Sequence, residues 1–308
     1  MFGQSHTLFR PPAEADSLII RVADSCPWNG CTFCGMYKGV PYKFHGLEKA
    51  EREFSKAWKQ RPDARRIFLA DGDVMHLGFH PSEAREAPRM RGNDQRERQT
   101  LEKMLISLNE KFKNLARVSI YANGSSILAK TDEELRRLKE LKLHTLYMGL
   151  ESGDNQTLRE VNKRESAEEM IEAGCRAQAA GLRMSVMILI GLAGEDRSLE
   201  HARNTAKVVN QMQPRLLSAL RLVTTPNTPL YKSGFKMITE YAAVVELHEM
   251  IQGLELEQTV FRADHSSNII PLEARFPKDK TRLLNQLDVL LASGQLDTKS
   301  PGRLPWSL

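Results

Sequence analysis

The sequence lacks any long hydrophobic run. No apolar stretch approaches the roughly 20 residues that a helix needs to span a bilayer. Residues 1–16, MFGQSHTLFRPPAEAD, also lack the apolar core of a signal peptide. We therefore expect a cytoplasmic protein that makes no contact with a membrane.

Cysteine is scarce, with four residues in a chain of 308. Cytoplasmic thiols stay reduced, so clustered cysteines there bind metal more often than they form disulfides. Cys26, Cys31 and Cys34 share the stretch DSCPWNGCTFCGMYKG in a C-x4-C-x2-C spacing. A closed structural metal site needs four protein ligands. Three thiolates alone favour a metal site that keeps one position open.

The chain also lacks internal repeats and low-complexity segments. Its composition, 41% hydrophobic and 27% charged, is typical of a globular protein, and its length is enough for one large α/β barrel or two modest domains. The net charge of +5 is mild, and it permits an anionic ligand or a nucleic acid without requiring either.

Short apolar, β-branched runs alternate with amphipathic patterns along the chain. Strands are predicted at 17–23, 66–70, 117–122, 145–150, 184–190 and 216–223, and helices at 46–60, 97–113, 131–141, 165–180, 197–212 and 240–255. This alternation predicts an α/β protein with a parallel sheet. Six such units predict a partial (β/α)6 TIM-like barrel over residues 1–258, followed by a C-terminal extension at 259–308. Residues 78–98, charged and interrupted by Pro and Gly, are predicted to form a loop, either a lid or a surface insertion.

Polar or small residues follow each predicted strand. They are Cys26, Asp71, Asn123, Glu151, Gly191 and Thr224. In parallel α/β barrels, ligands bind where the strands end and the loops begin. We therefore expect the functional site at this end of the sheet.

These motifs together resemble the radical S-adenosylmethionine (radical SAM) superfamily over about residues 10–230. Phe33 stands directly before the last clustered cysteine, as the family motif prefers. The resemblance implies that Cys26, Cys31 and Cys34 bind a 4Fe-4S cluster and that SAM binds the open iron. The spacing of four residues between Cys26 and Cys31 departs from the commonest family pattern.

The resemblance also implies which residues bind SAM. LADGDVM would receive the SAM amino group through Asp71, Gly72 and Asp73. YMGLESGDNQTLREVNK resembles the subgroup that contains methylthiotransferases and oxygen-independent coproporphyrinogen oxidases. This segment implies that Glu151 and Ser152 face SAM and that Lys163 binds the SAM carboxylate. The segment ILIGLAGE implies that Gly191 lies beside the adenine. Asn123, at another strand end, is also expected to face SAM.

A substrate site is predicted from the C-terminal part of the chain. Arg262, His265 and Asn268 would contact substrate if their segment covers the barrel mouth. Arg221 lies within an apolar strand, where a charge is rarely left unpaired, so it would face a carboxylate or form a salt bridge.

We predict an enzyme that cleaves SAM reductively to a 5'-deoxyadenosyl radical, which abstracts hydrogen from a small-molecule substrate. An electron donor such as flavodoxin or ferredoxin is implied as a partner. A tetrapyrrole- or RNA-modifying enzyme is an alternative, although nothing beyond the mild basic charge supports nucleic acid. A further alternative is a zinc-knuckle interaction protein without catalysis, in which His45 or His6 completes a site with the three cysteines.

Overall fold

The computed structural model describes residues 8–77 and 100–305. The loop predicted at 78–98 lies outside the described residues, and so does His6. Two compact units are present: Met1–Asn29, Met36–Met148 and Cys175–Arg183 form the first, and Gly30–Gly35, Gly149–Gly174 and Met184–Leu308 form the second. Cys26 therefore belongs to the first unit, whereas Cys31 and Cys34 belong to the second.

Parallel strands form the sheet of the first unit. Its order is β1 (Leu18–Arg21), β4 (Arg66–Ala70), β5 (Arg117–Tyr121) and β6 (Leu143–Glu151), which ends in the second unit. The predicted strand at 17–23 is divided, because Ala23–Asp24 (β2) pairs instead with Lys43–Phe44 (β3) in a small antiparallel ribbon. Strand β4 is fully buried from Ile67 to Ala70, as expected for a strand covered on both faces.

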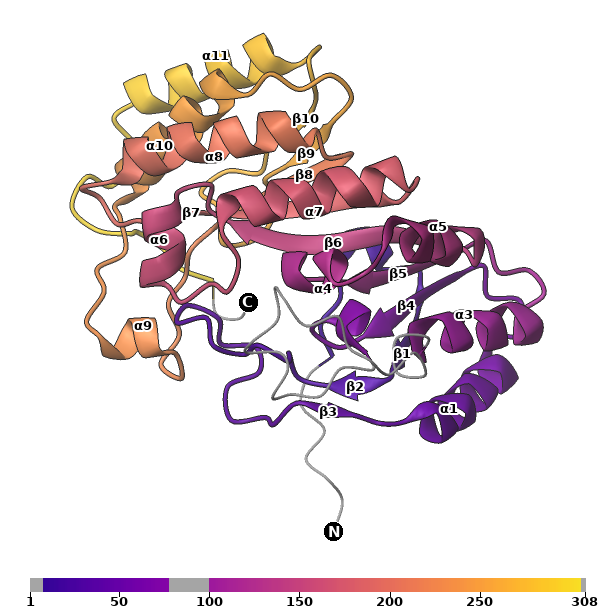
Figure 1. Ribbon diagram of the computed structural model, residues 1–308. Coiled ribbons are helices and arrows are strands. Elements are labelled where there is room, and N and C mark those ends of the chain that lie inside the picture. The colour runs from indigo at the N-terminus through magenta and orange to yellow at the C-terminus, as the bar shows by residue number, and fades with distance from the viewer. Residues whose placement is uncertain (1–7, 78–99, 306–308) are drawn as a thin grey trace. The chain divides into compact units, whose positions relative to one another are not determined.

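Helices pack beside one another along this sheet (Figure 1). Helix α1 (Leu47–Gln60) contacts α3 (Thr100–Lys111), and α3 contacts α5 (Asp132–Glu140). The start predicted for α5 is confirmed: Thr131 Oγ1 accepts from the Glu134 amide, and the Glu134 carboxylate accepts from the Thr131 amide, which makes a capping box. The short elements η1 (Pro12–Glu14), η2 (Val74–His76) and α4 (Gly124–Leu128) were not predicted.

The second unit repeats this architecture. Strands β7 (Arg183–Ile190), β8 (Leu216–Arg221) and β9 (Val260–Arg262) are parallel neighbours, and β10 (Glu273–Arg275) adds antiparallel to β9. Helix α10 (Glu240–Gly253) packs against α8 (Ser198–Met212) and α11 (Lys280–Ala292), in the row seen in Figure 1. Helices α6 (Asn155–Glu160) and α9 (Pro229–Lys232) are short, and α7 (Ala167–Ala179) runs from the second unit into the first.

The predicted α/β class is confirmed by these parallel strands and their helices. The boundary predicted at residue 258 stays a prediction. Residues 259–308 contribute β9, β10 and α11 to the second unit, and β9 extends the sheet from β8.

A polar cluster is enclosed in the first unit beside aromatic side chains. Phe68, Tyr121 and Tyr147 meet edge to face, with ring centroids 5.2–6.2 Å apart. Tyr147 Oη donates to the buried carboxylate of Glu14 at 2.8 Å, and Arg117 lies 3.5 Å from that carboxylate. The charge of Glu14 is thereby compensated, as the burial of a carboxylate requires.

A pH effect on stability is expected from His144 in β6. Burial, and then the positive charges of Arg183, Lys139 and Arg117, lower the pKa of His144 to about 4. The unfolded chain, with an ordinary pKa near 6.5, therefore binds more protons between about pH 4 and 6.5. The contribution of His144 to the free energy of unfolding is expected to fall as the pH drops through this window.

The check is urea unfolding at pH 7.5, 6.5 and 5.5 for the wild type and His144→Gln. The variant should lose less stability than the wild type over this range. Equal pH dependence in both proteins would contradict the assignment. The comparison uses slopes, because the substitution also removes the 2.8 Å contact between His144 Nδ1 and Thr145 Oγ1.

Candidate functional site

The first cysteine lies on a loop that the first unit holds at both ends. Cys26 follows β2, and Asn29 Nδ2 donates to the Tyr37 carbonyl at 2.9 Å. Lys38 Nζ in turn donates to the Asn29 carbonyl at 2.7 Å. These bonds tie the beginning of the cysteine loop to the segment that follows it. All four cysteines of the chain lie in described residues, and they form no disulfide with one another.

Gly72 lies against this loop at the end of β4. A Cβ atom added there would be 2.8 Å from Cys26 Cβ, 3.0 Å from Cys26 Cα and 2.9 Å from the Tyr37 ring. Any side chain at position 72 would collide with backbone and ring atoms that have little freedom to move. The neighbours that require a glycine here are Cys26 and Tyr37, and the predicted role of Gly72 towards SAM stays a prediction.

Asp71 is fully buried and engaged by two groups of the first unit. Its carboxylate lies 3.3 Å from Arg21 Nε and accepts from Tyr37 Oη at 3.2 Å. Burial, followed by the negative charge of Asp71, raises the pKa of Tyr37 far above its ordinary value, so its hydroxyl stays a donor. The predicted role of Asp71 towards the SAM amino group stays a prediction. In the structure, this side chain joins β1, β4 and the segment after the cysteines.

Asp73 begins the short helix η2. One carboxylate oxygen accepts from the His76 amide at 3.3 Å, and the other accepts from Ser126 Oγ at 2.6 Å. Ser126 belongs to α4, which follows β5. Asp73 thus links the turns after two neighbouring strands, at the strand ends where the sequence predicts a site.

The Cys26 sulfur is half-buried near these groups. Burial raises the pKa of the Cys26 thiol to about 11, and the negative charge of Asp73 adds to this effect. Asn123 Nδ2 lies 3.8 Å from Cys26 Sγ, and its hydrogen bond lowers the pKa of the thiol. Burial thus disfavours the thiolate of Cys26, and a metal bound by this residue would have to displace its proton. The structure brings Asn123 to Cys26, where an amide stabilises a thiolate ligand.

Cys31 and Cys34 lie on a second part of the loop that is bonded on both sides. Thr32 donates its amide to the Val161 carbonyl at 2.8 Å, and its own carbonyl accepts from the Leu230 amide at 3.0 Å. Phe33 packs against a buried apolar cluster of Val161, Leu192 and Leu222. These contacts hold the backbone on both sides of Thr32, and Cys31 and Cys34 are both half-buried.

Glu151 and Lys163 meet in the second unit. Lys163 Nζ lies 3.6 Å from Glu151 Oε1, and both side chains are largely buried. Burial raises the pKa of Glu151, whereas the charge of Lys163 lowers it. Glu151 also has φ of 62°, a left-handed conformation that is uncommon for a residue other than glycine. Such strain is often found at binding sites. The two predicted SAM ligands are therefore neighbours.

Ser152 and Gly191 lie at the ends of β6 and β7. Ser152 is fully buried, and its Oγ accepts from the Asp154 amide at 2.9 Å. Gly191 has φ of 85°, and a Cβ atom there would be 3.0 Å from Ile238. Both residues shape the turns after their strands.

Arg221 forms hydrogen bonds to backbone carbonyls of the second unit. Its guanidinium donates to the carbonyls of Ser267 and Pro301, each at 2.9 Å, and of Arg303 at 3.4 Å. Burial lowers the pKa of Arg221. Arg221 forms no salt bridge within residues 8–77 and 100–305, although the negative charge of Glu240 opposes the effect of burial on its pKa. A substrate role of Arg221 stays a prediction.

The other predicted substrate residues differ in their surroundings. Arg262 lies 3.3 Å from both Asp264 and Glu273 at the surface. His265 Nδ1 contacts Ser267 Oγ at 2.9 Å, and burial lowers the pKa of His265. Asn268 Nδ2 donates to the Ala219 carbonyl at 2.8 Å, which places Asn268 beside β8.

The zinc-knuckle alternative receives no support from His45. Its Nε2 lies 2.9 Å from the Asp24 carboxylate. Within the part of the chain that the structure describes, no three His, Cys, Asp or Glu side chains converge as a ready-made ion site.

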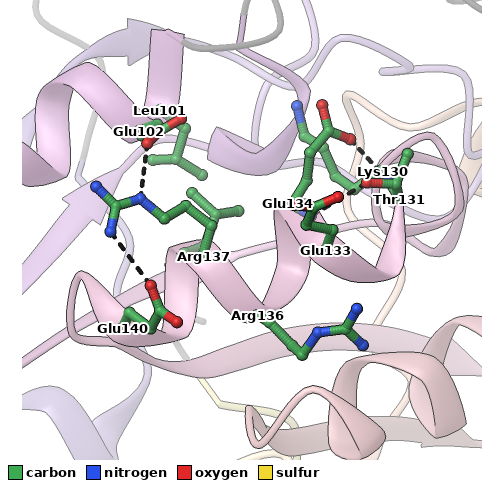
Figure 2. Close-up of a pocket in the computed structure, with 10 residues that line it drawn as sticks. Leu101, Glu102, Lys130, Thr131, Glu133, Glu134, Arg136, Arg137 and Glu140 are labelled. Atoms are coloured by element: carbon green, nitrogen blue, oxygen red, sulfur yellow. Dashed lines mark hydrogen bonds and ion pairs between the residues drawn. The ribbon is translucent and has the colours of Figure 1, made fainter.

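A hollow of the first unit is lined by residues of α3 and α5 (Figure 2). Its charged groups are paired with one another: Arg137 bonds to Glu102 at 2.9 Å and to Glu140 at 3.2 Å, and Glu134 caps the helix at Thr131. None of the predicted site residues lines it. We therefore place the candidate site at the strand ends and not in this hollow.

The family of the protein follows from a comparison with family models. The model described as the radical SAM superfamily matches residues 20–206, which is more than half of the 308 residues. The chain belongs to the radical SAM superfamily. It is therefore an enzyme, and the cofactors of its family are a 4Fe-4S cluster and SAM, as predicted.

Solved structures show the same fold. Methylornithine synthase (PylB) is 15% identical with a TM-score of 0.50, over 89% of this chain and 81% of that one. The radical SAM methyltransferase TsrM from Kitasatospora setae, solved with cobalamin and a 4Fe-4S cluster, is 14% identical with a TM-score of 0.52, over 82% of this chain and 43% of that one. No curated protein matches the chain in sequence. The TM-scores indicate a shared fold, and identities this low leave the substrate open.

Some relatives are much longer than this chain. The chain spans half of the hydrogenase maturase HydG and less than half of TsrM.

In the described residues, no helix combines the length and the hydropathy that a membrane span requires.

Sequence reasoning missed two residues that hold the site. Arg21 and Tyr37 fix Asp71, and both lie close in sequence to the cysteines. Arg21 could have been found, because an arginine inside a short apolar strand is expected to have a charged partner. Tyr37 carried no signal beyond its place after Cys34.

Proposed function

We propose that this enzyme cleaves SAM reductively and uses the resulting 5'-deoxyadenosyl radical to take a hydrogen atom from a small-molecule substrate. The observation that carries the proposal is the C-x4-C-x2-C loop, packed against Gly72 at Cys26 and bonded through Thr32 at Cys31 and Cys34, in a chain of the radical SAM superfamily.

The donor set fits the cofactor. Thiolates are the usual ligands of iron–sulfur clusters, and three of them leave one iron for another ligand. When bound, the reduced cluster supplies the electron that breaks SAM into methionine and the radical. An external reductant such as flavodoxin or ferredoxin would supply that electron.

The chain's own residues would hold SAM in place. We assign the turn at Asp71, Gly72 and Asp73 to the amino group and Lys163 to the carboxylate. Glu151, Ser152 and the turn at Gly191 would line the nucleoside. Support comes from their positions at strand ends and from the burial of Lys163, whose ammonium group can bind a carboxylate.

The substrate would enter beside the C-terminal segment. We propose that residues 259–308 form an extension that contacts substrate through His265 and Asn268, because Asn268 is bonded to the β8 backbone. We assign Arg262 to the same substrate site; its side chain, with an exposed fraction of 43%, is more accessible than those of His265 and Asn268.

The test uses protein purified without oxygen and reconstituted with iron and sulfide. Metal analysis should find about four irons per chain. Addition of SAM and dithionite should release 5'-deoxyadenosine and methionine in equal amounts. One zinc per chain, no cluster and no cleavage would refute the proposal.

A further inference from the structure

Glu246 is a fully buried carboxylate in the middle of helix α10. It accepts from three donors: the Gly191 amide at 2.7 Å, His201 Nδ1 at 3.0 Å, and Ser198 Oγ in a short hydrogen bond. Ser198 and His201 lie on α8, whereas Gly191 is the first residue after β7. One side chain thus joins two helices to the end of a strand, all within the second unit.

Helix packing alone does not call for a carboxylate at this position. The exposed fractions of Glu246 and His201 are both 0%, and the two helices, which pack against each other, bury apolar side chains such as Val209, Val244 and Leu247. An ionised group is costly to bury unless donors surround it, and a leucine here would avoid that cost. Its specific effect is to fix the direction of the Gly191 N–H, which donates to Glu246 Oε1.

Gly191 begins a turn with little freedom. Its φ is 85°, Ile238 lies against its Cα, and its carbonyl accepts from the Gly194 amide at 3.2 Å. Leu192, the next residue, packs in the apolar cluster that also receives Phe33. Phe33 is the neighbour of Cys34. Glu246 therefore fixes a turn that is packed against the cysteine loop.

We propose that Glu246 is a positioning residue that holds the Gly191–Gly194 turn in the conformation that binds the nucleoside of SAM. This inference rests on the proposed SAM site at the end of β7. Glu246 itself touches no ligand. Its loss is expected to weaken SAM binding and to leave iron binding unchanged, because none of its donors is a cysteine.

Two substitutions separate the effect of the Glu246 hydrogen bonds from the effect of its charge. In Glu246→Gln, the amide oxygen can still accept from Gly191 and His201, while the amide nitrogen donates to Ser198 Oγ, because a hydroxyl also accepts. Glu246→Ala removes every acceptor and leaves the Gly191 amide buried without a partner. Gln should therefore rescue the function that Ala loses.

The experiment measures the SAM dissociation constant of reconstituted, oxygen-free protein by equilibrium dialysis. The change in the electron paramagnetic resonance signal of the reduced cluster on SAM addition is recorded in parallel. We expect at least about a tenfold weaker affinity for Glu246→Ala and a change under about threefold for Glu246→Gln, in line with the loss of one buried hydrogen bond to a charged group. Iron content should stay the same in both.

Thr259→Val is the matched control. It removes another buried polar contact of the second unit, from Thr259 Oγ1 to the Pro214 carbonyl at 2.6 Å. This variant should lose stability without losing SAM affinity. If Glu246→Ala does not fold, Glu246→Met replaces it, because methionine fills the volume without supplying an acceptor.

Each outcome has a defined meaning. Wild-type affinity in the Ala or Met variant overturns the inference, and so does an equal loss in the Gln variant, which would indicate that charge and not geometry matters. An equal loss in Thr259→Val would reduce Glu246 to a general stabiliser and also overturn it. A wild-type protein that carries the cluster but does not bind SAM would refute the proposed function, and the inference with it.

Discussion

Replacing Cys31 with alanine is expected to abolish iron binding and SAM cleavage together. A cluster ligand removed in this way leaves one iron without its thiolate, and the cluster then has only two protein ligands. We expect less than about one iron per chain and 5'-deoxyadenosine formation below about 1% of wild type, beyond the 10–100-fold typical of outer-shell changes.

The fold should survive this substitution. The backbone around Cys31 is held by the Thr32 amide, the Thr32 carbonyl and the Gly30 carbonyl, which accepts from Asn162 Nδ2 at 2.9 Å. Circular dichroism and thermal unfolding should therefore match those of apo wild type. Cys175→Ala is the matched control, because Cys175 is exposed on α7 and should be dispensable. Full iron content and cleavage in Cys31→Ala would remove that residue from the ligand set.

The second large effect is expected from Gly72→Ala. The new methyl group would lie 2.8 Å from Cys26 Cβ and 2.9 Å from the Tyr37 ring, well inside normal contact distance. Overpacking of this kind costs about 1–3 kcal/mol. Because the neighbours are the first cysteine and an aromatic ring, the clash is expected to displace Cys26. We expect reconstituted iron to fall by at least about half, a loss comparable to the lower end of outer-shell effects on metal sites.

Gly174→Ala provides a comparison for the cost of overpacking alone. The three atoms nearest to a Cβ at Gly174 all belong to the flexible side chain of Met212, the first being Cγ at 2.6 Å. That variant should lose some stability and keep its iron. Iron content and SAM affinity equal to wild type in Gly72→Ala would show that the close approach at Cys26 has no bearing on the cluster.

Much of the fold follows from local patterns. The alternating apolar runs predicted all six principal parallel strands, β1 and β4 to β8, because strands buried on both faces read as short continuous hydrophobic stretches. The antiparallel pair β9 and β10 was not predicted. Each of these strands has three residues, too short for a hydrophobic period to show. Helix α11, which follows them, was missed as well.

The candidate site, too, was predictable from the sequence only in part. The cysteine spacing and the residues after each strand identified the family and its cofactors, since both are properties of adjacent residues. The surroundings of Asp71 were beyond such reasoning. Its partner Tyr37 is 34 positions away in the sequence, and the pair forms only when β4 lies beside the segment after the cysteines.

By itself, the sequence determined the family of this protein and the features that point to its cofactors: three cysteines on one loop, glycines and carboxylates at strand ends, and the class of fold that places strand ends together. Only the tertiary structure decided what the buried charges do. Arg221 holds the carbonyls of residues 46–82 positions away, and Glu246 holds a glycine 55 positions away. A buried charge must find its partners wherever the packed chain supplies them, and that choice is made by packing and not by any local pattern.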